Sequence, residues 1–102
     1  MNKKYSLSHE AIRDLDDIAT YLAKFNLKSA ENFIKRFGKK CNNLIKFPYI
    51  GRNYAEIATN LRGIPLDEYI ILYQVTEQEI EIVRVVSGYR DLESLFSDKE
   101  ES

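Results

Sequence analysis

The chain has 102 residues, of which 44% are hydrophobic and 30% charged, and its formal net charge is -1 at pH 7. These values are typical of one globular domain, so we expect residues 1–102 to form a single unit with a frayed, acidic tail at 97–102. The near-zero charge excludes a protein whose whole surface binds nucleic acid, because such binding depends on neutralising phosphates.

Several other classes are disfavoured by what the chain lacks. No segment has the roughly 20 apolar residues of a membrane span, and no signal peptide follows Met1, so we expect a cytoplasmic protein. The single cysteine, Cys41, cannot form an internal disulfide and is expected to pack in the core. With one histidine, His9, expected at the surface or near a helix cap, we predict neither a metal site nor a cofactor.

The first predicted elements are a strand at 4–7 and a helix that begins after the N-cap residue Ser8 and ends near Asn26. Apolar residues recur in this helix at three- and four-residue spacing, which predicts one buried face. The acidic residues lie mostly on the other face, so we expect these carboxylates to be solvated: Asp14, Asp16 and Asp17.

A second helical pattern runs from Ala30 to Ile45, and Pro48 ends it. A short link at 26–29 predicts an antiparallel helical hairpin. Gly38 lies inside the second helix, where glycine is costly, and this predicts a close approach of the two helices there.

Extended segments follow at 61–66, 69–76 and 80–87, and the last two are expected to form a β-hairpin. Pro65 suits the end or the edge of its strand. The apolar run from Tyr69 to Val75 indicates that both faces of its strand are covered, one by the helical hairpin and the other in part by a short helix at 91–96. The expected fold is therefore α+β.

Charge is unevenly distributed along the chain. Residues 28–52 contain seven basic residues and one acidic residue, whereas residues 67–81 contain five acidic residues and no basic one. This polarity would suit an acidic partner near the second helix. Five further polar residues surround the strands and could bind an anionic ligand: Arg52, Arg62, Arg84, Tyr89 and Arg90. Within a largely apolar strand, Arg84 is expected to form an internal ion pair.

The order of motifs resembles the RelE/ParE toxin superfamily over residues 4–96. The motifs are Phe47-Pro48-x-x-Gly51-Arg52, Leu61-Arg62, Tyr69-x-x-Leu72-Tyr73, Ile82-Val83-Arg84-Val85, Gly88-x-Arg90-Asp91 and Leu95-Phe96. The resemblance implies a helical hairpin packed on a twisted, mainly antiparallel sheet of about four strands, with a short C-terminal helix. It also implies neutralisation by an antitoxin whose tail wraps the toxin.

Two activities occur in this superfamily: RelE-like members cut messenger RNA on the ribosome, and ParE-like members inhibit DNA gyrase. The RelE pattern has an arginine where this chain has Ile70 and a tyrosine where it has Phe96, although Arg90 matches. Losing a cation and a phenol disfavours RNA cleavage, although Tyr89 could replace the phenol. Ser87 stands where relatives often have histidine, which leaves the subfamily open.

We therefore expect a ParE-like toxin that inhibits gyrase by binding and has no catalytic residues. The target-binding residues predicted on physical grounds are Arg52, Arg62, Tyr89 and Arg90. The alternative is a ribosome-dependent endoribonuclease that uses Arg62, Tyr89 and Arg90. A third possibility is a non-toxic scaffold that only binds its antitoxin.

The expected partner is a ParD-like antitoxin in a hetero-oligomer, with DNA contacted only through that antitoxin. Antitoxin tails are often acidic, so contact is predicted at a strand edge or along the basic second helix. The residues predicted for this contact are Lys35, Arg36, Lys39 and Lys40.

Overall fold

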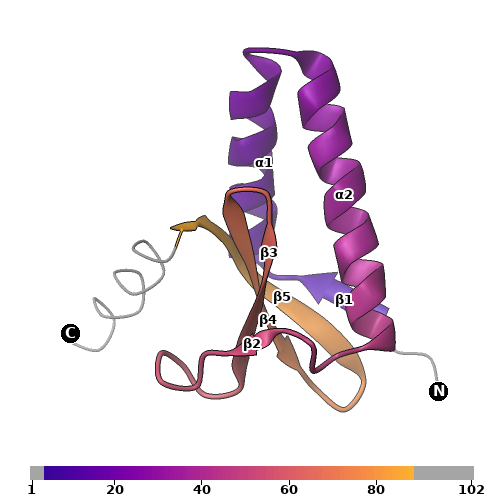
Figure 1. Ribbon diagram of the computed structural model, residues 1–102, viewed down its shortest axis with the longest axis vertical. Helices are drawn as coiled ribbons and strands as arrows, with labels where there is room; N and C mark the ends of the chain where they lie inside the picture. The colour runs from indigo at the N-terminus through magenta and orange to yellow at the C-terminus, as the bar shows by residue number, and fades with distance from the viewer. Residues whose placement is uncertain (1–3, 89–102) are drawn as a thin grey trace.

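The computed structural model describes residues 4–88. Its elements, in chain order, are β1 (Lys4–Leu7), α1 (His9–Ala23), α2 (Leu27–Lys46), β2 (Arg52–Asn53), β3 (Leu61–Leu66), β4 (Tyr69–Val75) and β5 (Glu79–Ser87). The two helices form an antiparallel hairpin whose connecting turn projects beyond the sheet (Figure 1). This arrangement confirms the expected α+β fold.

The strands form one sheet in the order β1-β5-β4-β3-β2. β1 runs parallel to β5 and the other neighbours are antiparallel, so the expectation of a mainly antiparallel sheet is confirmed. The sheet has five strands rather than about four. The difference arises because β2 contains two residues, Arg52 and Asn53, which is too short for a periodic pattern.

Polar side chains fix where each helix begins. The Ser8 hydroxyl accepts a hydrogen bond from the Ala11 N–H at 3.0 Å and donates one to the Val83 carbonyl at 2.7 Å. The predicted N-cap is therefore correct, and it also ties α1 to β5. Asn26 caps α2 by accepting from the Lys28 N–H at 2.8 Å. The link between the helices is thus residues 24–26, earlier than predicted, because Asn26 begins the second helix.

The main core lies between the helical hairpin and one face of the sheet. Both helices contribute, and Cys41 is fully buried within α2, as expected for a small core residue. β3 and β4 contribute alternate residues, as the two-residue period of a strand requires. β5 departs from this spacing between Ile82 and Val85, where its register with β4 shifts. The buried members from the sheet are Ile64, Leu66, Ile71, Tyr73, Ile80, Ile82 and Val85.

A smaller apolar cluster covers the opposite face of the sheet. Ile70 and Leu72 of β4 lie there with Leu61, Val86 and Tyr54. The prediction that both faces of β4 are covered is confirmed, and part of the cover comes from the loop after β2, through Tyr54 and the neighbouring Ile57 and Ala58. The short helix predicted at 91–96 and the tail at 97–102 lie outside the described residues.

The prediction for Gly38 is wrong. A β-carbon placed on Gly38 would meet nothing within 4 Å beyond its own helix, so α1 does not approach α2 closely at this position. Neither helix in residues 4–88 has the combination of length and apolar character that a membrane crossing requires.

Candidate functional site

Arg52 and Arg62, two of the predicted target-binding residues, lie on neighbouring strands but point to opposite faces of the sheet. Arg52 is paired across β2 and β3 with Gly63, and Arg62 with Asn53. Directly paired residues share a face and successive residues alternate, which separates the two arginines. Arg52 is placed over the Tyr54 ring at 4.8 Å. These two residues therefore do not form one cluster.

The Arg62 guanidinium holds the loop that leads out of α2. It donates to the Gly51 carbonyl at 2.9 Å and to the Tyr49 carbonyl at 3.3 Å, and it lies 5.0 Å from the centre of the Tyr49 ring. In the endoribonuclease alternative, Arg62 would donate hydrogen bonds to a phosphate of the RNA. In this structure, part of its guanidinium donates to backbone carbonyls of the protein instead. Tyr89 and Arg90, the other residues of that alternative, lie outside the described residues.

The hydroxyl of Tyr73 in β4 holds the same loop, a role that the sequence pattern does not predict. It donates to the Pro48 carbonyl at 2.8 Å and accepts from the Gly51 N–H at 3.0 Å. Burial raises the pKa of Tyr73, partly offset by the Gly51 N–H and by the positive charge of Arg62. A tyrosine inside an apolar strand is predicted to be a core residue. Its hydroxyl is the only feature of the sequence that indicates a polar partner, because a buried hydroxyl usually forms a hydrogen bond.

Arg84 forms an ion pair with Asp14 of α1, which confirms the predicted internal pairing. Its guanidinium donates to both carboxylate oxygens, at 2.7 and 3.0 Å, and this raises the pKa of Arg84. Asp14 also accepts from the Val85 N–H at 2.9 Å. The prediction that all three aspartates of α1 are solvated is therefore wrong for Asp14, which meets β5 beyond the end of β1, and right for Asp16 and Asp17, which are exposed.

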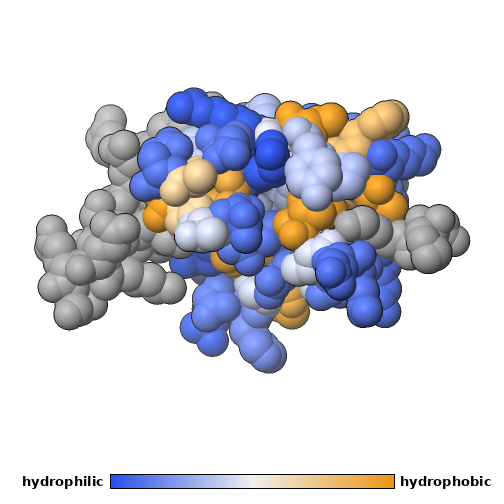
Figure 2. Space-filling view, turned by 90° about the horizontal axis from the view of Figure 1, so that it is seen from below, coloured by the Kyte–Doolittle hydropathy of each residue, from blue (hydrophilic) through white to orange (hydrophobic). Residues whose placement is uncertain are grey.

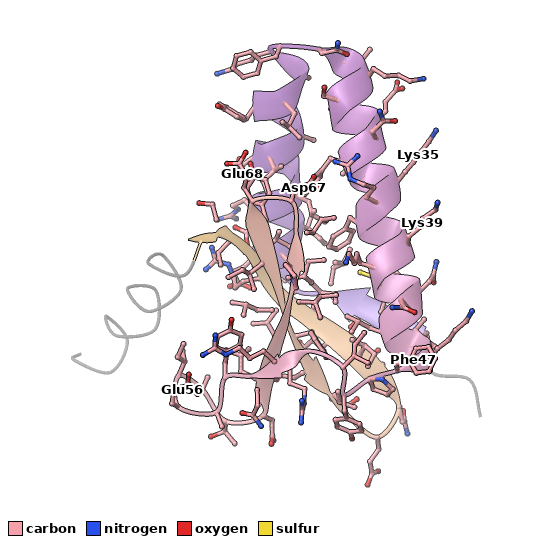
Figure 3. All side chains as sticks on the ribbon, in the orientation of Figure 1. Lys35, Lys39, Phe47, Glu56, Asp67 and Glu68 are labelled. Atoms are coloured by element: carbon pink, nitrogen blue, oxygen red, sulfur yellow. The ribbon has the colours of Figure 1, made fainter. Side chains whose placement is uncertain are left out.

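The four residues predicted to bind the antitoxin occupy different positions on α2. Lys35 and Lys39 are exposed and extend outward from α2 (Figure 3), whereas Lys40 is half-buried. Arg36 forms an ion pair with Asp67 in the turn between β3 and β4. Asp67 and Glu68 belong to the acidic segment of the sequence, so the basic and acidic segments meet at this pair (Figure 3).

Two clefts meet at Arg36. One, of about 590 Å³, lies between the helical hairpin and the β3–β4 turn, and Phe33 and Tyr69 are among its lining residues. The other, of about 390 Å³, is a shallow groove between α2 and β3. We call this second cleft the basic groove, and its lining residues are Arg36, Lys39, Lys40, Asn43 and Leu66.

The edge of β3 beside the basic groove offers few hydrogen-bond donors. β2 pairs with β3 at Arg62 and Gly63, and no strand in residues 4–88 continues that pairing to Pro65. Because the Leu61 carbonyl accepts from the Tyr54 N–H at 2.8 Å, alternate residues of β3, including Pro65, direct their backbone groups to this edge. Pro65 has no N–H, as suits the edge position predicted for it, and this disfavours pairing with an added strand.

Comparison with solved structures identifies the class of fold. The chain is similar to one described as the chromosomal ParDE TA system from P. aeruginosa, with a TM-score of 0.71 and 18% sequence identity. The similarity covers 87% of this chain and 98% of that one. The helical hairpin on a five-stranded sheet is thus a fold that this chain shares with that chain of the toxin-antitoxin system.

The sequence places the chain more narrowly. Residues 5–92 match the family described as the ParE toxin of type II toxin-antitoxin system, parDE. The protein therefore belongs to the ParE toxin family, in agreement with the resemblance found in its motifs. Comparison with curated proteins gave no match.

Proposed function

We propose that this toxin inhibits DNA gyrase by binding to it. The observation that carries the proposal is the match to the ParE toxin family over residues 5–92, since gyrase inhibition is the usual action of ParE-like toxins. Gyrase acts on DNA in the bacterial cytoplasm, so the toxin would act there.

The surroundings of Ile70 favour binding over RNA cleavage. RelE-like toxins have an arginine at this position, and here Ile70 is 4% exposed in the apolar cluster with Tyr54, Leu61, Leu72 and Val86. A cation in that cluster would lose its hydration without a partner charge, which is strongly unfavourable. The chain is built around an apolar residue at this position, so it does not supply one of the cations expected for RNA cleavage.

The proposal is tested with purified toxin in two assays run side by side. Micromolar toxin should inhibit supercoiling of relaxed plasmid by gyrase and should leave translation of a reporter message in a cell-free system unchanged. Unaffected supercoiling together with blocked translation would overturn the proposal. New message ends inside codons, mapped by primer extension, would then identify the endoribonuclease alternative.

We infer that an antitoxin of the ParD type neutralises the toxin by occupying the basic groove. Three of its five lining residues are cationic, and Leu66 gives it an apolar floor. The adjacent edge of β3 is a poor site for strand addition because Pro65 lacks an N–H. These features favour an acidic segment that lies between α2 and β3 and places an apolar side chain near Leu66.

A further inference from the structure

The loop that leaves α2 exposes three large hydrophobic side chains within four residues. Phe47 is 55% exposed, Tyr49 is 65% exposed and Ile50 is 53% exposed. Figure 3 shows Phe47 at the end of α2, and Figure 2, which views the molecule from this end, shows hydrophobic groups among hydrophilic ones on the surface. Single exposed hydrophobic residues are ordinary, whereas a cluster of them indicates an interaction surface.

This loop is held in one conformation even though its hydrophobic side chains are not needed in the core. The Tyr73 hydroxyl bridges Pro48 and Gly51, and the Arg62 guanidinium donates to the carbonyls of Tyr49 and Gly51. A β-carbon on Gly51 would lie 2.5 Å from the Tyr73 hydroxyl, so the loop backbone packs directly on β4. A surface fixed in advance loses less conformational entropy when a partner binds.

Charge limits the kind of partner that fits. Residues 45–54 contain two charged residues, Lys46 and Arg52, and both are basic. Arg52 lines a small pocket together with Ile50, and the Arg62 guanidinium adds a third positive charge beside the Tyr49 ring, on the opposite face of the sheet from Arg52. A second copy of this chain would bring like charges together, whereas a partner with carboxylates around an apolar patch would be complementary.

We propose that Phe47, Tyr49 and Ile50, with Lys46 and Arg52 beside them, form the surface by which the toxin binds its protein target. The occupant is a folded protein that presents an apolar patch bordered by carboxylates. This inference rests on the proposed function in one respect, because it assumes that the protein acts by binding a target. The main contact with the target is thus placed on the loop and not on Arg62, whose guanidinium holds the loop backbone.

The test compares two variants of the full-length toxin that each remove exposed hydrophobic side chains. Phe47→Ser with Ile50→Ser changes the loop, and Phe25→Ser with Leu27→Ser removes side chains that are even more exposed, at the tip of the helical hairpin. Each is induced in a bacterial host without an antitoxin, with protein levels checked by immunoblot, and purified for thermal unfolding and the gyrase supercoiling assay.

The loop variant should keep the unfolding midpoint of the wild type, since both side chains are exposed, and should lose growth arrest. In the gyrase assay it should need at least about tenfold more protein for half-inhibition, as expected when central contacts of an interface are removed. The hairpin-tip variant should match the wild type in both assays. Growth arrest by the loop variant at wild-type levels, or an equal loss in the hairpin-tip variant, would overturn the inference.

The two proposals fail in different ways. If wild-type protein arrests growth and leaves gyrase unaffected, the gyrase proposal fails, while loss of arrest in the loop variant would still support this surface. If wild-type protein inhibits gyrase and the loop variant inhibits it equally, only the surface is wrong. Absence of growth arrest by the wild type would overturn both.

Discussion

Among the glycines of residues 4–88, Gly51 has the least room for a side chain. A β-carbon there would lie 2.5 Å from the Tyr73 hydroxyl oxygen and 2.9 Å from the Gly63 carbonyl oxygen. Because Tyr73 is fully buried and Gly63 contributes backbone, neither neighbour moves easily. We expect Gly51→Ala to lower the free energy of unfolding by about 1–3 kcal/mol, measured by urea denaturation.

Gly38 provides the matched control, since the same substitution there meets open space. Alanine is favoured over glycine inside a helix, so Gly38→Ala should raise the free energy of unfolding by about 0.5–1 kcal/mol. A loss of stability in Gly38→Ala, or none in Gly51→Ala, would contradict this account of the two positions.

Cys41 should be unreactive in the folded protein. Burial raises the pKa of its thiol from the ordinary 9.0 to about 12, and the side chain has no exposed surface. Since the thiolate is the reactive form, the fraction available at pH 8 falls roughly a thousandfold. Iodoacetamide should therefore label Cys41 rapidly in urea and hardly at all in native buffer, and rapid native labelling would contradict its burial.

The same shift has a defined effect on stability. A folded-state pKa above the unfolded value means that the unfolded thiol ionises first, so this contribution is present below pH 9 and is lost as the pH rises toward 12. Cys41→Ala should remove this part of the pH dependence, seen when urea denaturation of both proteins is compared at several alkaline pH values.

At the scale of secondary-structure elements, the ion pair between Asp14 and Arg84 joins α1 to β5. The two side chains are 14% and 27% exposed, so water screens their attraction only in part. Asp14→Ala would leave both Arg84 and the Val85 N–H without this carboxylate, and we expect a loss of about 2–3 kcal/mol in urea denaturation. Asp14→Asn keeps an acceptor and should lose less.

Asp17→Ala on the same helix is the control for this prediction. Asp17 is exposed, so its removal should change the free energy of unfolding by no more than about 0.5 kcal/mol. Equal losses from Asp14→Ala and Asp17→Ala would show that the charge of α1, and not the link to β5, determines the effect.

Elements with a long, regular pattern could be predicted from the sequence, and those determined by tertiary contacts could not. α2 follows a helical apolar period, and β4 and β5 are rich in β-branched and aromatic residues, so all three were predicted within a few residues. β2 has two residues and exists because β3 pairs with it, which no local pattern encodes. Asp14 looks solvated beside Asp16 and Asp17, and its role depends on the distance in space to Arg84, 70 residues away in sequence.

For the candidate site, the sequence could predict which residues take part but not how they are paired or placed. Basic residues of α2 were predicted as a partner-binding set, and the structure adds that Arg36 is paired with Asp67 while Lys40 is half-buried. Arg52 and Arg62 were predicted to lie on one surface, and their spacing in the sequence could not show otherwise. The register of β2 and β3 places them on opposite faces of the sheet. The role of Tyr73 required the path of the loop that it supports.

At the scale of the whole molecule, the excess of positive charge in residues 28–52 should set how fast an acidic antitoxin associates. Electrostatic steering depends on where the charges lie as well as on their sum. Two double variants separate these effects. Lys39→Glu with Lys40→Glu changes the basic groove, and Lys24→Glu with Lys28→Glu changes the hairpin tip.

Each double variant changes the net charge by four, from -1 to -5, so the total charge of the two proteins is equal. If the antitoxin occupies the basic groove, the Lys39 and Lys40 variant should associate with a cognate antitoxin at least about tenfold more slowly at low salt, as measured by stopped-flow fluorescence. The difference should shrink as salt screens the charges. Equal rates for the two variants would mean that total charge governs association, and the antitoxin would then have to contact another surface of the toxin.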